Sequence, residues 1–103
     1  MTSTQPKLDF EQLVFRLERN HKCVLRLEKN LNSYKYEPKN YECFVKLREL
    51  KTAFSKLAKK QMVLFDEIQH HSLQFNDALE RVENSIKQYH KLEKGLATYL
   101  LDL

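Results

Sequence analysis

Histidine and cysteine are the residues of this chain best suited to metal binding or nucleophilic catalysis, and it has four of the first and two of the second. A helical metal site needs two ligands on one face, about four residues apart. His70 and His71 are adjacent, so on a helix they point about 100° apart. His21 and Cys23, two positions apart, also diverge. The spacing therefore predicts no metal site and no bound cofactor.

The sequence lacks the motifs that bind phosphate or support redox catalysis. Its single glycine, Gly95, cannot build a glycine-rich loop, and neither a P-loop nor a CxxC pair is present. Carboxylates such as Glu80 and Glu83 lie in amphipathic segments, where pairing with lysine or arginine is their ordinary role. We therefore expect a protein that is not an enzyme.

The two cysteines, Cys23 and Cys43, are expected to stay reduced. If the segments on either side of Pro38 pair as antiparallel helices, residue 23 faces residue 52, about 13 Å along the axis from Cys43. A disulfide needs Cα atoms within about 7 Å. Reduced thiols, with no long apolar segment and no apolar N-terminal signal, predict a cytoplasmic protein, with the nucleus as the alternative compartment.

Long helices are the elements that this composition favours. The chain has 103 residues with one glycine and two prolines, and 31% of its residues are charged. One heptad register runs from Leu47 to Leu103 as an apolar stripe with alternating spacings of three and four, and a similar series covers residues 10–34. This pattern is typical of helices that pack along one face. We therefore predict an all-α fold.

Capping signals set the expected helix boundaries. Asp9 with Gln12 and Asp77 with Glu80 have the spacing of capping boxes, and Asn40 is a suitable N-cap. The expected organisation is a flexible N-terminal tail at 1–7 and a single helical domain at 8–103, with helices at about 9–33, 41–70 and 77–101.

The segment from His70 to Asp77 decides between two architectures. A turn there gives an antiparallel three-helix bundle, or coiled coil, that buries every stripe within one chain. Without a turn, the chain is a helical hairpin with one very long helix of about 60 residues, which needs a second chain and is dimeric. The unbroken register favours the long helix, whereas the usual length of globular helices favours the bundle. We predict the bundle.

Positive charge is concentrated in the first two thirds of the chain. Basic and acidic residues number eight and five in 1–39, six and four in 40–71, and four and five in 72–103. This basic face is either the solvated side of amphipathic helices or a surface for acidic proteins or anionic membranes. No nucleic-acid-binding signature accompanies it, so nucleic acid is an unlikely partner. The candidate basic face consists of Arg16, Arg19, Lys22, Arg26, Lys29, Lys56, Lys59 and Lys60.

Apolar residues extend beyond the stripe in two places. Met62 and Val63 lie well off it, and Phe44 and Val45 are likewise spread around their helix. A helix that is apolar all round needs burial on more than one side. Met62 and Val63 therefore either touch both neighbouring helices or mark a candidate partner surface. Phe44 and Val45 either extend that surface or close the first loop.

Polar residues interrupt the stripes at Asn20, Gln61, His71 and Ser85. Asn20 and Gln61 lie near the middles of their helices, and antiparallel pairing brings them within about one to two turns of each other. Polar residues at such positions lower stability but fix register and partner choice. We predict a buried, register-setting contact between Asn20 and Gln61.

Two function hypotheses follow from these patterns. The chain resembles the generic antiparallel helical modules of spectrin-type repeats, SNARE regulatory bundles, tubulin-binding cofactors and tethering-complex subunits, and no motif selects one of them. The first hypothesis is a non-catalytic protein–protein interaction module, a small adaptor or a subunit of a cytoplasmic helical assembly in trafficking or cytoskeletal organisation. Its partner is another helical protein or a second copy of the chain. The alternative is a dimeric, basic helical rod that binds anionic membrane surfaces.

Overall fold

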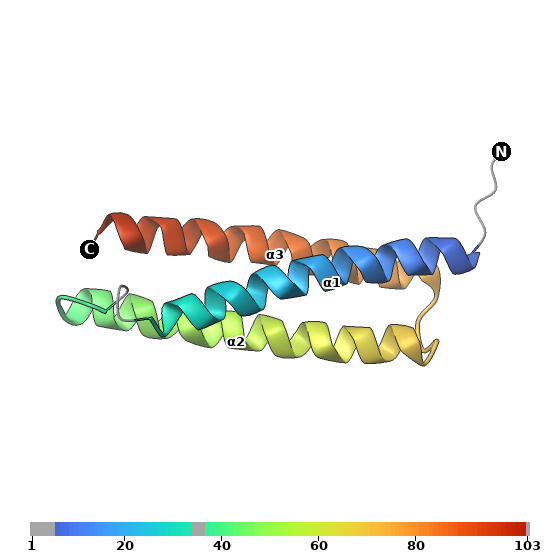
Figure 1. Cartoon of the computed structure of the whole chain (residues 1–103), viewed down its shortest axis with the longest axis horizontal. Coiled ribbons are helices and arrows are strands. Elements are labelled where there is room, and N and C mark those ends of the chain that lie inside the picture. Colours follow the sequence, from blue (N-terminus) through green and yellow to red (C-terminus); the bar gives the residue numbers. More distant parts are fainter. Residues whose placement is uncertain (1–5, 34–36, 103) are drawn as a thin grey trace.

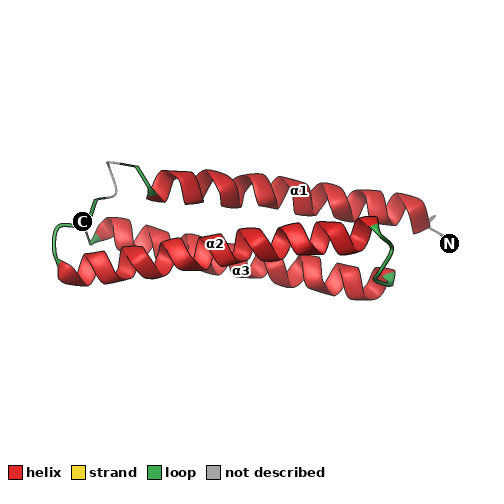
Figure 2. Ribbon diagram, turned by 90° about the horizontal axis from the view of Figure 1, so that it is seen from below, coloured by secondary structure: helices red, strands yellow, loops and turns green. Residues whose placement is uncertain are grey.

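Three long helices make up the structure, which is a computed structural model that describes residues 6–33 and 37–102, with side chains from residue 9 onward. They are α1 (Pro6–Leu31), α2 (Tyr41–Gln69) and α3 (Phe75–Leu101). The helices lie side by side with α2 antiparallel to both others, and every pair is in contact (Figure 1, Figure 2). The predicted all-α three-helix bundle is confirmed.

Helix α1 begins earlier than the capping signals indicate. Its first residue is Pro6, and proline suits the first helical position because its missing N–H has no partner to lose there. Asp9 lies in the first turn and not at the N-cap, so the capping box predicted at Asp9 is wrong. Residues 6 and 7 are helical and do not belong to the predicted 1–7 tail, whose residues 1–5 lie outside the described part of the chain. At its other end, α1 stops at Leu31 and not at residue 33.

The N-terminus of α2 is capped as its sequence predicts. Asn40 has an extended backbone with φ of −148°, and its side-chain oxygen accepts a hydrogen bond from the backbone N–H of Cys43 at 2.9 Å. This bond satisfies one of the N–H groups that the first turn of a helix leaves without a partner.

The turn after α2 is a Schellman motif centred on His71. The backbone N–H of Ser72 donates to the carbonyl of Glu67 at 2.9 Å, and that of His71 donates to the carbonyl of Ile68 at 3.1 Å. His71 has a φ of 55°, the only positive φ of a non-glycine residue in the described ranges. These bonds satisfy the last carbonyls of α2 and reverse the chain direction.

This turn excludes the long-helix architecture for the described chain. Residues 70–74 are not helical, so the predicted alternative of a hairpin with one very long helix is wrong. The heptad phase is the same in α2 and α3 although no helix connects them. The capping box predicted at Asp77 is also wrong, because α3 begins at Phe75 and Asp77 lies in its first turn.

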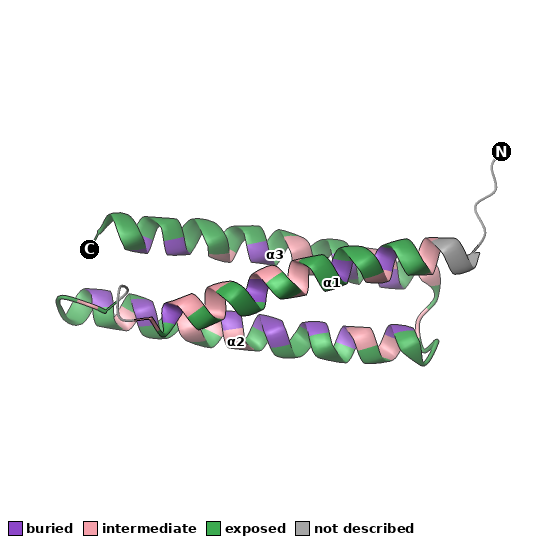
Figure 3. Cartoon of the chain, viewed as in Figure 1, coloured by how far each residue is buried: buried purple, intermediate pink, exposed green. Residues whose placement is uncertain are grey.

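The core consists of two apolar clusters along the bundle axis. Figure 3 shows buried residues on the inward-facing sides of all three helices. Leu17, Leu64 and Val82 belong to the cluster near the α2–α3 turn, whereas Val24 and Leu57 belong to the one at the other end. Most heptad positions of α2 and α3 are buried, with His71 exposed and Leu103 outside the described residues. The stripe therefore packs within the chain.

Replacing His71 by glycine is expected to stabilise the protein. The left-handed conformation costs an L-residue about 1–2 kcal/mol, and the greater chain entropy of an unfolded glycine offsets about 0.5–1 kcal/mol of that. His71→Gly should therefore raise the free energy of unfolding by about 0.5–1 kcal/mol, measured by urea denaturation. Ser72→Gly, at a neighbour without a positive φ, is the matched control and should lower it. A His71→Gly protein no more stable than the parent contradicts this account of the turn.

Candidate functional site

A polar layer crosses the middle of the bundle and is centred on Gln61, whose side chain is 0% exposed. Its amide nitrogen donates to Asn20 Oδ1 at 2.8 Å and to Ser85 Oγ at 3.0 Å. Its amide oxygen lies 2.8 Å from His21 Nδ1, and accepts a hydrogen bond from that ring nitrogen when it carries the proton. The predicted contact between Asn20 and Gln61 is therefore present, with His21 and Ser85 as further members.

This polar layer lies between the two apolar clusters of the core. Leu17 and Leu64 are one turn from it on one side, and Val24 and Leu57 are one turn from it on the other. No buried polar side-chain atom in the described residues lacks a hydrogen-bond partner. Leaving such an amide unpaired costs about 1–3 kcal/mol. The layer therefore favours the one helix register in which Gln61 finds all its partners.

The structure does not bring the four apolar residues of the candidate partner surface together. Phe44 and Val45 lie near the start of α2, where Phe44 stacks on the exposed Tyr41 with ring centroids 6.4 Å apart. Met62 and Val63 lie about 27 Å further along the helix. Both are exposed, so they are not buried between two neighbouring helices.

Met62 and Val63 also border different grooves. Met62 lines a groove of about 470 Å³ between α1 and α2, together with Leu25 and Phe65. Val63 lines a groove of similar volume, about 470 Å³, between α2 and α3, whose wall includes Asn84. A partner can therefore contact one of these residues without covering the other.

The candidate basic face likewise separates into two groups. Arg16, Arg19, Lys22, Arg26 and Lys29 are exposed on α1. In contrast, Lys59 and Lys60 border the groove between α2 and α3, and Lys56 lies near Gln88 of α3. The α2–α3 groove is crossed by an ion pair in which Arg81 donates to both oxygens of Glu67, at 3.1 and 3.2 Å.

The five α1 cations have no carboxylate partner in the described chain. The ion pairs within the described residues all involve side chains of the other two helices and of the residues just after each of them. They join Lys46 to Asp102, His70 to Asp66, Arg81 to Glu67 and His90 to Glu93. Arg26 instead lies 3.8 Å from the sulfur of Cys23, and Arg19 lies 5.7 Å from the ring centroid of Phe15. The charge of α1 is therefore left available to solvent or to a partner.

Phe15 and Leu25 are surface residues that the sequence analysis did not identify. Phe15 is 58% exposed and Leu25 is 44% exposed. Phe15 is two positions from the buried Leu17, which places it on the opposite side of α1. A helical-wheel projection of the sequence could therefore have identified it as exposed. Leu25 is next to the buried Val24. Its exposure depends on where α2 packs.

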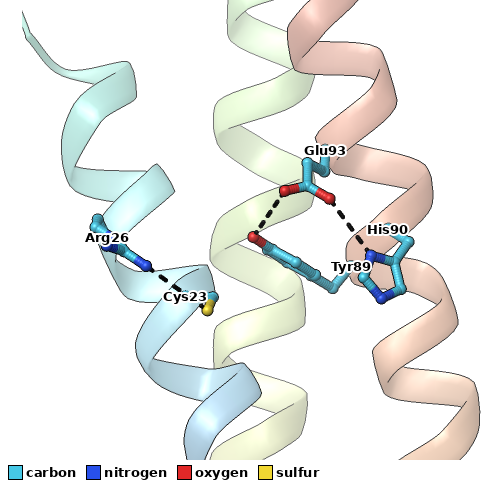
Figure 4. Close-up of polar contacts among 5 residues, drawn as sticks. All are labelled: Cys23, Arg26, Tyr89, His90 and Glu93. Atoms are coloured by element: carbon cyan, nitrogen blue, oxygen red, sulfur yellow. Dashed lines mark hydrogen bonds and ion pairs between the residues drawn. The ribbon is translucent and has the colours of Figure 1, made fainter.

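One further cluster brings a thiol near a buried tyrosine. Tyr89 Oη donates to Glu93 Oε2 at 3.3 Å, and His90 Nδ1 lies 3.4 Å from Glu93 Oε1. Figure 4 shows Cys23 on α1, with Tyr89 between it and His90. Burial, and after it the Glu93 carboxylate and the Cys23 thiol, raise the pKa of Tyr89 to about 12. The cluster thus lacks the contact between cysteine and histidine that a nucleophile and its base require.

Both cysteines are free thiols, Cys43 buried and Cys23 half-buried. No group of three or more histidine, cysteine, aspartate or glutamate side chains within the described ranges could hold a metal ion. The described helices also lack any stretch with the length and hydropathy needed to cross a bilayer. Comparison with protein-family models, with curated proteins and with solved structures finds no match to this chain.

Replacing Asn20 and Gln61 together by leucine is expected to raise the melting temperature, because two polar side chains of the central layer give way to apolar packing. Either single replacement leaves a polar group without its partner, so each should be less stable than the double variant. Urea denaturation of the two singles and the double measures this coupling. The double variant should also lose specificity of register or oligomeric state. A lower melting temperature than the parent contradicts the assignment.

Tyr89 is expected to destabilise the fold as the pH rises above 10. Its pKa is about 12 in the folded protein, whereas an unfolded tyrosine has a pKa of about 10. Between these values the unfolded chain loses a proton that the folded chain keeps, so the free energy of unfolding falls. Burial, and after it Cys43, raise the pKa of Tyr99 as well, which acts in the same direction.

Tyr89→Phe removes one of these titrating groups and should make the fall between pH 10 and 12 shallower, as measured by urea denaturation across that range. Tyr41→Phe is the matched control, because the Tyr41 side chain is exposed, and it should keep the parent slope. Equal slopes for Tyr89→Phe and the parent contradict the assignment.

Proposed function

We propose that this chain is a non-catalytic protein–protein interaction module, a small adaptor or a subunit of a cytoplasmic helical assembly. Trafficking and cytoskeletal organisation are the processes in which such helical modules commonly serve. Its partner in this proposal is another helical protein. The chain contributes a rigid bundle whose outer surface, and not a reactive centre, performs the function.

The observation that carries the proposal is the unequal distribution of exposed apolar side chains. Large ones lie on α1 and α2, at Phe15, Leu25, Met62 and Val63 among others. On α3, by contrast, such side chains are exposed only at the C-terminal end, at Leu100 and Leu101. Single exposed apolar side chains are ordinary on a protein surface, so their concentration on particular helices is the informative observation. Large apolar residues exposed along the length of α1 and α2, but only at the end of α3, favour a surface on α1 and α2 that a partner covers.

The completeness of the core supports this interpretation. Residues of all three helices fill the two apolar clusters, so the exposed side chains on α1 and α2 contribute little to holding the fold together. Tyr89 and Tyr99 have pKa values raised away from neutrality, which is not the direction that acid–base catalysis near neutral pH favours. These features favour binding over chemistry.

A photoreactive amino acid at position 62 tests the proposal. In cells that naturally contain the protein, the full chain with this probe is expected to form discrete adducts with one or a few proteins. The same probe at Lys87, on the exposed side of α3, is the control. Adducts specific to position 62 that excess unmodified protein suppresses support the proposal. Adducts identical at both positions, or none at position 62, contradict it.

A further inference from the structure

The groove between α1 and α2 combines apolar walls with unpaired positive charge. Leu25 of α1 and Met62 of α2 line it, as does the half-buried Phe65, whose ring centroid lies 5.7 Å from that of His21. Met62 is 58% exposed. The groove is therefore an apolar channel that the fold leaves open, parallel to two helices.

From Lys22 onward, positive charge follows the α1 side of this groove, whose other end carries Glu18. Lys22 lines it, and Arg26 and Lys29 continue the exposed row along the same helix. None of the three has a carboxylate partner in the described chain. The apolar channel therefore has a basic border on one side.

We propose that this groove binds an amphipathic helix of another protein, with apolar side chains at i, i+3 or i+4, and i+7 in the channel and acidic side chains along its α1 edge. Bound in this way, the partner is the fourth helix of a bundle, the ordinary way to cover a groove between two helices. Acidic side chains match the unpaired cations, and such complementarity sets partner choice and association rate. This inference rests on the proposed function and names the chemistry of its partner.

Two other occupants fit the groove less well. A second copy of the chain, docked symmetrically with α1 against α1, sets the α1 cations against the same cations, which repel. An anionic membrane fits the cations and Phe15, but Glu18 and Asp66 also line the groove and oppose it. A helical protein partner avoids the first conflict, and it can place its acidic side chains opposite Lys22 and the cations beyond it, away from Glu18 and Asp66, as a uniformly anionic surface cannot.

A displayed library of amphipathic helical peptides tests the chemistry of the partner. The peptides share one apolar stripe and differ at their edge positions, which are Glu-rich, Lys-rich or Gln-rich. Selection on the full chain is expected to enrich the Glu-rich class, with affinity that weakens as salt is added. Met62→Glu places a charge in the apolar channel and changes no other part of the surface, so it should abolish this enrichment. No preference for acidic edges, or enrichment that Met62→Glu leaves intact, overturns the inference.

A charge reversal gives the matched control. Lys22→Glu with Arg26→Glu should weaken binding of a selected Glu-edged peptide about tenfold at low salt, as expected for the loss of two exposed ion pairs. The same double variant should improve binding of its Lys-edged counterpart. Lys87→Glu with Lys91→Glu makes the same change at the same spacing on α3 and should leave both affinities unchanged. Equal effects of the two double variants overturn the inference, because they show that net charge alone decides binding.

Two comparisons separate the outcomes. In sedimentation with vesicles of phosphatidylserine and phosphatidylcholine, we expect the protein to stay in the supernatant. If the protein instead binds the vesicles in a salt-sensitive way, and Phe15→Ser abolishes this binding, the α1 face binds a membrane and the inference is wrong. If the probe at position 62 captures a protein but the peptide library yields no acidic helices, the proposed function is retained and the inference of an acidic partner helix is wrong. If the probe captures nothing, the proposed function itself fails.

Discussion

The buried amide of Gln61 is the constraint on which the arrangement of the three helices depends. Its hydrogen bonds are directional and reach Asn20 on α1 and Ser85 on α3 at the same level of the bundle. Sliding either helix by one turn moves its partner about 5.4 Å away and leaves the amide unpaired. The apolar clusters on either side are less selective, because burial of apolar surface is non-directional. The polar layer therefore sets the register that the clusters then stabilise.

That register decides which surfaces remain uncovered. With Asn20 level with Gln61, α2 and α3 extend past the C-terminal end of α1 (Figure 1). The first turns of α2 then lie beside the end of α3, where Lys46 lies 3.5 Å from Asp102, and Phe44 and Tyr41 stay exposed. The same register places Leu25 and Met62 on opposite walls of one groove. A single buried side chain thus influences features of the surface far from it.

The charge on α1 is only partly explained by stability: Lys29 lies in the last turn, where a cation interacts favourably with the helix dipole, but the neighbouring cations repel one another. Lys22 and Arg26 are four residues apart, and Arg26 and Lys29 three, spacings at which like charges destabilise a helix by about 0.2–0.5 kcal/mol per pair. Phe15, exposed among these cations, adds apolar surface that the core does not use. A row that weakens its own helix and has no carboxylate partner in the described chain is consistent with a role in binding. On α3, Lys87, Lys91 and Lys94 have the same spacing, but no large apolar side chain is exposed beside them.

The sequence by itself determined the helices, their stripes and several of their ends. Heptad spacing specified which residues are buried, because one face of a helix can be read from its 3.6-residue period, and Asn40 was recognisable as a cap because its side chain bonds only three residues away. The register carried no signal for the break at His71, since two packed helices and one long helix need the same stripe. Only the tertiary structure decided that break and the exposure of Leu25. It also divided the basic and apolar residues between two grooves, because which side of a helix is covered depends on neighbours distant in the sequence.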